Sequence, residues 1–186
     1  NQSNYCDGAG IVDINGNPLN SNGAWSIVGG SRPWFSDDND GTAELDVDQA
    51  ITNTGGGSYD LVYQYTDPTT GCAGQDVLTI SLNPDINIEF EYRSTTAAPG
   101  DPWNPFPAGD LTMCSTSDVI ELRGIDGSGT TIGDGTFSGP GVTDTGSGTG
   151  EFDPAAAGNG NHTITYDYTD PVTTCSETVT HTVQIG

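Results

Sequence analysis

The sequence predicts an all-β fold organised as two tandem β-sandwich domains. The chain has 186 residues with 27 glycines and 11 prolines, a composition typical of many short strands joined by turns. Its apolar residues lie in alternating runs, the pattern of strands that bury one face. A long segment also occurs twice, which indicates two copies of one module.

The repeat is clearest toward the end of each copy. Residues 59–72 read YDLVYQYTDPTTGC, and residues 162–175, 103 positions later, read HTITYDYTDPVTTC. Both contain Tyr-x-Tyr-Thr-Asp-Pro, a short spacer and a cysteine, and an alternating segment follows each. The match continues upstream with small insertions, where Trp25 aligns with Phe137. We therefore place the domain boundary near Asn83-Pro84, giving domains 1–83 and 84–186.

Eight segments are predicted as strands. They are 24–28, 61–66 and 77–82 in the first copy, and 86–92, 119–123, 135–138, 163–169 and 179–185 in the second. The first copy has no counterpart of 86–92, so we expect its first strand to be missing or to lie upstream. Residues 48–57 are expected to form a loop, and no segment has a useful length of helical periodicity. Short strands spaced by turns, at about 100 residues per copy, favour an immunoglobulin-like sandwich.

Four cysteines divide evenly between the copies. Cys6 and Cys72 are 66 positions apart, and Cys114 and Cys175 are 61 apart. This symmetry favours the disulfides Cys6–Cys72 and Cys114–Cys175 over the two other connectivities. Closing such a loop would stabilise a domain by roughly 4 kcal/mol in the chain-entropy model. Free or metal-bound thiols are the weaker alternative, since no C-x2-C pair is present. Disulfides would indicate an oxidising compartment.

The charge balance excludes several classes of function. There are 26 acidic residues against 3 arginines and no lysine, which gives a net charge of −23. This field repels nucleic acids and anionic membranes, and the composition excludes lysine chemistry such as a Schiff base. No run approaches the roughly 18 apolar residues of a membrane span. Divalent cations or high salt would offset the self-repulsion.

Two acidic segments are candidate calcium sites, because calcium prefers six to eight oxygen ligands from flexible loops. The densest oxygen cluster is Asp37, Asp38, Asn39 and Asp40. Asp13, Asn15 and Asn17 have the D-x-N-x-N rhythm of a calcium loop but lack its distal glutamate. The alternative is that these are turn and surface residues. Calcium is the only cofactor that the sequence predicts.

The sequence does not predict an enzyme. Residues 144–147 spell the aspartic-protease signature D-T-G-S, but only once, whereas that chemistry needs two carboxylates. His162 and His181 are the only histidines, and both belong to the second copy. Trp34 and Trp103 lie in irregular segments without a counterpart in the other copy. They are candidate contacts for a sugar or a protein, with loop packing as the alternative.

A family resemblance adds to this interpretation. The second copy contains GTFSGPGV at 135–142, GEFDPAAAGNGNHTITYDYTD at 150–170 and then Cys175. These segments resemble the Ig-like or PKD-like tandem repeats of giant Bacteroidetes cell-surface proteins, gliding-motility adhesins among them. The resemblance covers residues 110–186 well and 1–82 more loosely.

The resemblance implies a non-catalytic repeat segment of a secreted cell-surface adhesin or filament, which acts as a stalk or as a surface-binding module. Its partners would be neighbouring repeats of the same chain and an external surface, glycan or protein. Two alternatives remain open. One is a self-assembling filament subunit joined by strand addition. The other is a pair of carbohydrate-binding accessory domains of a secreted hydrolase.

Overall fold

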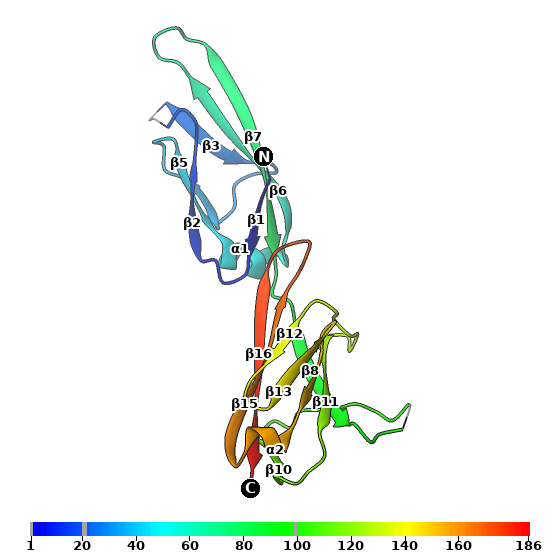
Figure 1. Ribbon diagram of the computed structural model, residues 1–186. Helices are drawn as coiled ribbons and strands as arrows, with labels where there is room; N and C mark the ends of the chain where they lie inside the picture. Colours follow the sequence, from blue (N-terminus) through cyan, green and yellow to red (C-terminus); the bar gives the residue numbers. More distant parts are fainter. Residues whose placement is uncertain (1, 20–21, 99) are drawn as a thin grey trace. The chain divides into compact units, whose positions relative to one another are not determined.

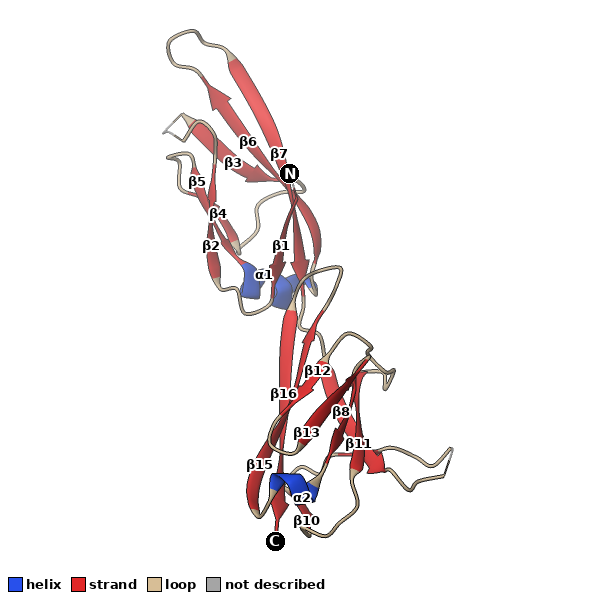
Figure 2. Cartoon of the chain, viewed as in Figure 1, coloured by secondary structure: helices blue, strands red, loops and turns tan. Residues whose placement is uncertain are grey.

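The computed structural model describes residues 2–19, 22–98 and 100–186. It divides into two compact units, Asn1–Asp85 and Ile86–Gly186, so the division falls two residues after the expected boundary. Among these described residues, strands form most of the regular structure of each unit, with one short helix apiece (Figures 1 and 2). Each unit contains two sheets, and the predicted all-β fold is confirmed.

The first unit has a four-stranded sheet in the order β1-β7-β6-β3 and a three-stranded sheet in the order β2-β5-β4. β1 runs parallel to β7, whereas the other neighbouring strands are antiparallel. The elements are β1 (Gln2–Cys6), β2 (Ile11–Asn15), β3 (Gly23–Ile27), β4 (Phe35–Asp37), β5 (Thr42–Asp46), α1 (Val47–Thr54), β6 (Gly57–Thr66) and β7 (Ala73–Asn83).

The second unit has a four-stranded sheet in the order β10-β16-β15-β12 and a five-stranded sheet in the order β13-β14-β11-β8-β9. β10 runs parallel to β16. The elements are β8 (Ile88–Ser94), β9 (Asn104–Pro105), β10 (Leu111–Met113), β11 (Ile120–Asp126), β12 (Thr136–Ser138), β13 (Val142–Gly146), β14 (Thr149–Phe152), α2 (Pro154–Ala157), β15 (Gly160–Thr169) and β16 (Ser176–Ile185).

The two units repeat one topology. β1, β7, β6 and β3 correspond in order to β10, β16, β15 and β12, and β2, β5 and β4 correspond to β11, β14 and β13. The difference is at one edge, because β8 and β9 extend the second unit's sheet beside β11. Among the described residues of the first unit, no strand lies along the equivalent side of β2. Ile11 of β2 is accordingly 64% exposed.

All eight predicted strands are present, as β3, β6, β7, β8, β11, β12, β15 and β16. Several begin or end a few residues from the predicted limits. The strands that the sequence pattern missed are β1, β2, β4, β5, β9, β10, β13 and β14, which have two to five residues each. Segments this short show too little alternation to be recognised.

The loop expected at residues 48–57 is wrong, because α1 occupies most of it. Val47, Ala50 and Ile51 bury one face of this helix. Asp46 caps its first turn, since its side chain accepts a hydrogen bond from the Gln49 N–H at 2.9 Å. Gly55 ends the helix with a φ of 75°, a conformation that favours glycine. Asp153 caps α2 in the same way.

Each unit has one core, and a buried tyrosine holds an equivalent place in both. Tyr63 packs on Trp25 with ring centroids 5.0 Å apart, and Tyr166 packs on Phe137 at 4.6 Å. The Tyr63 hydroxyl donates to the Pro18 carbonyl. The Tyr166 hydroxyl donates to the Ile132 carbonyl at 3.0 Å. Burial raises the pKa of Tyr166 to about 12.

Two glycines lie against each of these tyrosine rings. They are Gly16 and Gly23 at Tyr63, and Gly124 and Gly135 at Tyr166. A Cβ atom at any of the four positions would fall within 3.0 Å of the ring. The glycines therefore allow the backbone to approach the ring closely, and the arrangement is repeated between the units.

Candidate functional site

A ladder of alternating charges covers part of the sheet of the second unit. The register of β8 and β11 places Arg93 opposite Glu121 and Glu91 opposite Arg123. The Arg93 Nε donates to Glu121 at 2.5 Å, and the Arg123 Nη2 donates to Glu91 at 2.7 Å. These side chains are between 18% and 33% exposed. Opposite charges facing each other across strands stabilise a sheet by roughly 0.2–1 kcal/mol per pair.

Trp103 lies over this ladder. The guanidinium carbons of Arg93 and Arg123 are each 4.5 Å from the centroid of its ring. β9 follows Trp103 immediately and pairs with β8, which holds the end of this loop against the sheet. A cation–π contact contributes roughly 0.5–1 kcal/mol at an exposed site and more where water is excluded. The loop is therefore tied to the sheet through its tryptophan.

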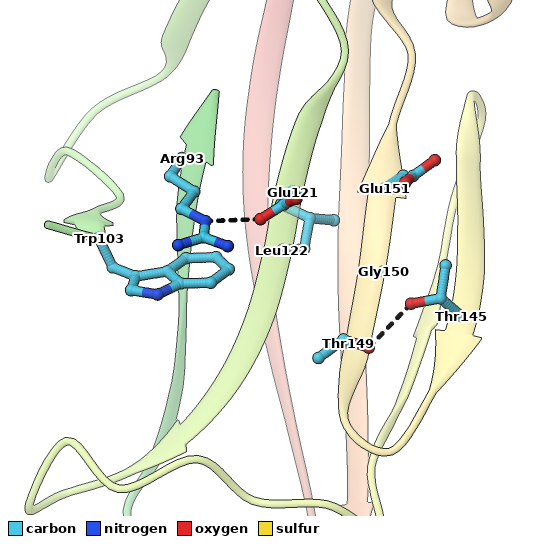
Figure 3. A pocket seen from close by; sticks show the side chains of 8 residues that line it. All are labelled: Arg93, Trp103, Glu121, Leu122, Thr145, Thr149, Gly150 and Glu151. Atoms are coloured by element: carbon cyan, nitrogen blue, oxygen red, sulfur yellow. Dashed lines mark hydrogen bonds and ion pairs between the residues drawn. The ribbon is translucent and has the colours of Figure 1, made fainter. Parts of the chain in front are cut away.

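A pocket of about 240 Å³ opens beside Trp103 (Figure 3). Its floor and walls come from β8, β11, β13, β14 and the loop that carries Trp103. The hydroxyls of Thr145 and Thr149 are 2.8 Å apart on one side of it. The lining residues are Arg93, Trp103, Glu121, Leu122, Thr145, Thr149, Gly150 and Glu151.

The lining of this pocket offers several kinds of polar group to a bound molecule. An indole, a guanidinium, two carboxylates and two hydroxyls offer donors and acceptors around a small space. Among the described residues, its lining contains no histidine or cysteine that could act as a nucleophile or as its base. Two of the three arginines of the chain are in the ladder. In the ladder the two arginines balance Glu91 and Glu121, whereas the whole chain has a net charge of −23.

Trp34 has a different position from the one expected of a contact residue. It is 2% exposed and belongs to the core of the first unit. Its ring meets Tyr59 edge to face, with centroids 5.2 Å apart. A side chain this little exposed offers almost no surface to a ligand, so the structure favours loop packing, the alternative, over a contact role for Trp34.

The acidic loop between β4 and β5 is organised by its own hydrogen bonds. The Thr42 N–H and hydroxyl both donate to Asp40, at 2.9 and 2.5 Å. These bonds lower the pKa of Asp40. The Asn39 N–H donates to Asp37 at 3.3 Å, and the Thr42 hydroxyl also reaches Asp38 at 3.1 Å. Within the described residues, no three His, Cys, Asp or Glu side chains are grouped so that they could hold a metal.

The second predicted calcium segment begins on a strand. Asp13 and Asn15 belong to β2 and are exposed on either side of the buried Ile14. Asp13 lies opposite Glu44 of β5, so two like charges face each other across the strands. Asn17 lines a different pocket, near Tyr63 and Trp25. Calcium binding at either segment stays a prediction.

The predicted disulfides Cys6–Cys72 and Cys114–Cys175 are wrong. Cys72 and Cys114 are free and exposed, while Cys6 and Cys175 are disulfide-bonded. The reason is the register of the last strand of each unit. Cys6 pairs with Asn83, whereas Cys72 precedes Ala73 at the opposite end of the 11-residue β7.

The same separation occurs in the second unit. Cys114 follows Met113, which pairs with Ile185, whereas Cys175 precedes Ser176 at the start of the 10-residue β16. At about 3.3 Å per residue, the two cysteines of a unit are roughly 30 Å apart, and a disulfide needs Cα atoms within about 7 Å. The symmetry of the sequence therefore identified equivalent cysteines but did not identify bonded pairs.

The histidines and the D-T-G-S segment have structural surroundings. The His181 ring stacks on Phe106, with centroids 4.6 Å apart, and its Nε2 is 2.6 Å from a Glu89 oxygen. His162 contacts the Gly158 carbonyl at 2.7 Å. Asp144 is part of β13 and accepts a hydrogen bond from the Phe137 N–H at 3.0 Å.

The charge ladder was not among the sites predicted from the sequence. Its signal is the pattern Glu-x-Arg, which occurs at Glu91–Arg93 and again at Glu121–Arg123. Two such strands placed antiparallel in register bring each arginine opposite a glutamate. The pattern is informative here because the chain has only one other basic residue, Arg32.

Comparisons with known proteins found structural similarity at low sequence identity and no family match. No family profile matches the sequence, and no curated protein matches it significantly. The structure is similar to the fibronectin(III)-like modules of CbhA from Clostridium thermocellum, with 15% identity over 99% of this chain and 89% of that one and a TM-score of 0.46. It is also similar to Drosophila N-cadherin EC1-4, with 12% identity over 89% of this chain and 41% of that one and a TM-score of 0.31. Scores this low carry no argument about function.

Across the described part of the chain, no helix has both the length and the apolar character needed to cross a membrane.

Proposed function

We propose that the chain is a non-catalytic segment of an extracellular repeat protein, whose modules act as a stalk and as surface-binding units. The observation that carries this proposal is the repetition of one strand topology in two units that differ in their loops. A conserved frame with variable loops is a common basis for binding modules. Two of the cysteines are disulfide-bonded, which agrees with an oxidising compartment outside the cytoplasm.

The proposed parent is a bacterial cell-surface adhesin, of which gliding-motility adhesins are one kind. The support is the resemblance of residues 135–142 and 150–170 to such repeats. In an array of modules, weak contacts with a surface add up through avidity. The pocket beside Trp103 is the binding site we propose, with a glycan or a protein side chain as the group it receives. Stacking on the indole and hydrogen bonds to Arg93 and the threonines would hold a sugar ring.

The binding role can be tested on beads that carry many copies of the chain. Adhesion to agarose, chitin and glass is measured under flow, with bare beads as the reference. We expect retention on at least one surface and a fall of about tenfold for Trp103→Ala, the loss that corresponds to about 1.4 kcal/mol. Val172→Ser is the matched control, because Val172 is 82% exposed in the same unit and does not line the pocket.

The outcomes separate the two halves of the proposal. Beads that adhere no better than bare beads would leave only the stalk role. Equal adhesion of the Trp103→Ala and unchanged chains would mean that the binding site lies outside this pocket. A carbohydrate-binding module of a hydrolase, the alternative from the sequence, requires glycan-array binding that the Trp103→Ala variant loses.

A second candidate function is assembly into a filament by strand addition. The observation that favours it is an open sheet edge in the first unit. In the second unit β8 pairs with β11, whereas no described strand of the first unit pairs with the equivalent edge of β2. Such an edge can accept a strand from a neighbouring molecule. Sedimentation of the chain over a range of concentrations tests the idea, and a monomer at the highest concentration would exclude it.

A further inference from the structure

The strand β8 of the second unit buries an aromatic side chain that has no counterpart among the described residues of the first unit. Phe90 of β8 is fully buried and lies opposite Gly124 of β11. Its ring centroid is 4.8 Å from that of His181, 5.3 Å from that of Phe137 and 6.4 Å from that of Tyr166. β8 therefore closes this part of the core with one ring.

The equivalent part of the first unit is an open pocket of about 240 Å³. Each of the four residues around Phe90 has a counterpart that lines this pocket. The counterparts are Gly16 for Gly124, Trp25 for Phe137, Tyr63 for Tyr166 and Leu78 for His181. Val77 also lines the pocket and is 42% exposed. The pocket therefore lies where the second unit holds the ring of Phe90.

The backbone of β2 beside this pocket can accept a further strand. Successive residues of a strand in an antiparallel sheet form their backbone hydrogen bonds on alternate sides. The Gly10 carbonyl and the Gly16 N–H both bond to residues that flank β5. Ile11, Asp13 and Asn15 consequently direct their N–H and carbonyl groups to the other side, where no described strand pairs with β2.

The charges on β2 complement those of a strand like β8. Asp13 lies opposite Glu44 of β5, and among the described residues neither carboxylate forms an ion pair. In the second unit the equivalent of Asp13 is Glu121, which Arg93 of β8 contacts at 2.5 Å. An arginine in the same place beside β2 would face Asp13, and opposite charges across strands stabilise a sheet.

We propose that the first unit binds an extended strand of another molecule along β2, and that this strand has the chemistry of residues 86–94. The strand runs antiparallel to β2, places an aromatic ring in the pocket opposite Gly16 and places an arginine beside Asp13. β8 is buried in its own unit, so a second molecule supplies the strand. This inference rests on the strand-addition candidate and states which side chains the added strand carries.

A peptide of residues 85–95 is the probe, and the complete chain is the acceptor. The labelled peptide is titrated with the chain, and binding is measured by fluorescence polarisation. We expect saturable binding, and Phe90→Ala in the peptide should weaken it at least about tenfold, because a buried aromatic anchor dominates an interface. Absence of binding, or equal affinity of the two peptides, would overturn the proposal.

A peptide in which Phe90 and Glu91 exchange places is the matched control. It keeps the composition and the charge but turns the ring to the opposite face of the strand. It should bind as weakly as the Phe90→Ala peptide. Binding as tight as that of the unchanged peptide would mean that the pocket does not receive the ring.

Substitutions in the first unit show where the peptide binds. Val77→Asp places a charge at the exposed rim of the pocket and should weaken binding about tenfold. Val28→Asp is the matched control, because Val28 is 57% exposed in the same unit and does not line the pocket. Equal affinity of the two variants would place the peptide elsewhere and refute the proposal.

An exchange of charge tests the register. Arg93→Glu in the peptide should weaken binding to the unchanged chain about threefold. On an Asp13→Arg chain the order of the two peptides should be reversed. The same order on both chains would contradict the proposed contact between the arginine and Asp13.

Sedimentation of the chain alone distinguishes this inference from the filament candidate. A monomeric chain that binds the peptide would support the inference and exclude self-assembly, because β8 then stays in its own unit. The bead assay of the pocket beside Trp103 is independent of both results, so peptide binding without adhesion would count against surface binding alone.

Discussion

Replacing Gly124 with alanine tests the packing of glycine against tyrosine in the second unit. The added Cβ would fall within 3.0 Å of the Tyr166 ring, closer than real Cβ atoms come. Tyr166 is fully buried and packs on Phe137, so the ring has little room to move. Overpacking of this kind costs roughly 1–3 kcal/mol. Displacing the hydroxyl from Ile132 would remove a hydrogen bond worth about 1 kcal/mol more.

The expected destabilisation of about 2–4 kcal/mol corresponds to a fall in Tm of roughly 10–25 °C for a domain of this size. Differential scanning calorimetry should show it in one of the transitions of the chain. Gly109→Ala is the matched control, because no atom lies within 4 Å of the Cβ it would add. Gly16→Ala, against Tyr63 of the first unit, should shift the other transition. A Gly124→Ala chain that melts within about 2 °C of Gly109→Ala would refute the packing argument.

Three further predictions concern a helix cap, a titration and a metal. Asp46→Ala should lower the free energy of unfolding of the first unit by about 1 kcal/mol, measured in urea, because it removes the cap. Asp46→Asn should keep the hydrogen bond from the Gln49 N–H and therefore the stability. An Asp46→Ala chain as stable as the unchanged chain would contradict the capping role. The stabilisation that comes from burying neutral Tyr166 should be complete below pH 10 and be lost as the pH rises toward 12, since the tyrosine of the unfolded chain ionises first. In urea unfolding, Tyr166→Phe should lose less stability over this pH interval than the unchanged chain. An equal loss of stability with pH in both chains would contradict the prediction. If the loop from Asp37 to Asp40 binds structural calcium, removal of the ion with EDTA should lower the Tm by more than about 2 °C, and a smaller change would argue against it.

The strong hairpins were predictable because their sequence signals are local. Alternation within residues 61–66 and 163–169 identifies β6 and β15, and the shared Thr-Asp-Pro turn marks where each ends. The helix α1 also had a local signal, Asp46 followed three residues later by Gln49, which is the spacing of a capping box. The eight residues of the helix are too few to show a clear helical period.

The cysteine pairing could not be predicted in the same way. The parallel register brings Cys6 to Asn83 and so separates it from Cys72, and β1 has too few residues to reveal that register. The charge ladder depends equally on which residues of β8 and β11 face each other. Trp34 and Trp103 look alike in the sequence, and only their three-dimensional neighbours separate a core ring from a surface one.

The parallel pairing of β1 with β7, and of β10 with β16, has a mechanical consequence. In the first unit, five residues from Gln2 to Cys6 run in register with residues from Thr79 to Asn83. Tension that pulls the start of one strand and the end of its parallel neighbour acts along the strands in opposite directions. The interstrand hydrogen bonds are then loaded in shear, all together, and cannot be peeled apart one after another. A stalk built from such modules would resist stretching at the same strand pair in every repeat.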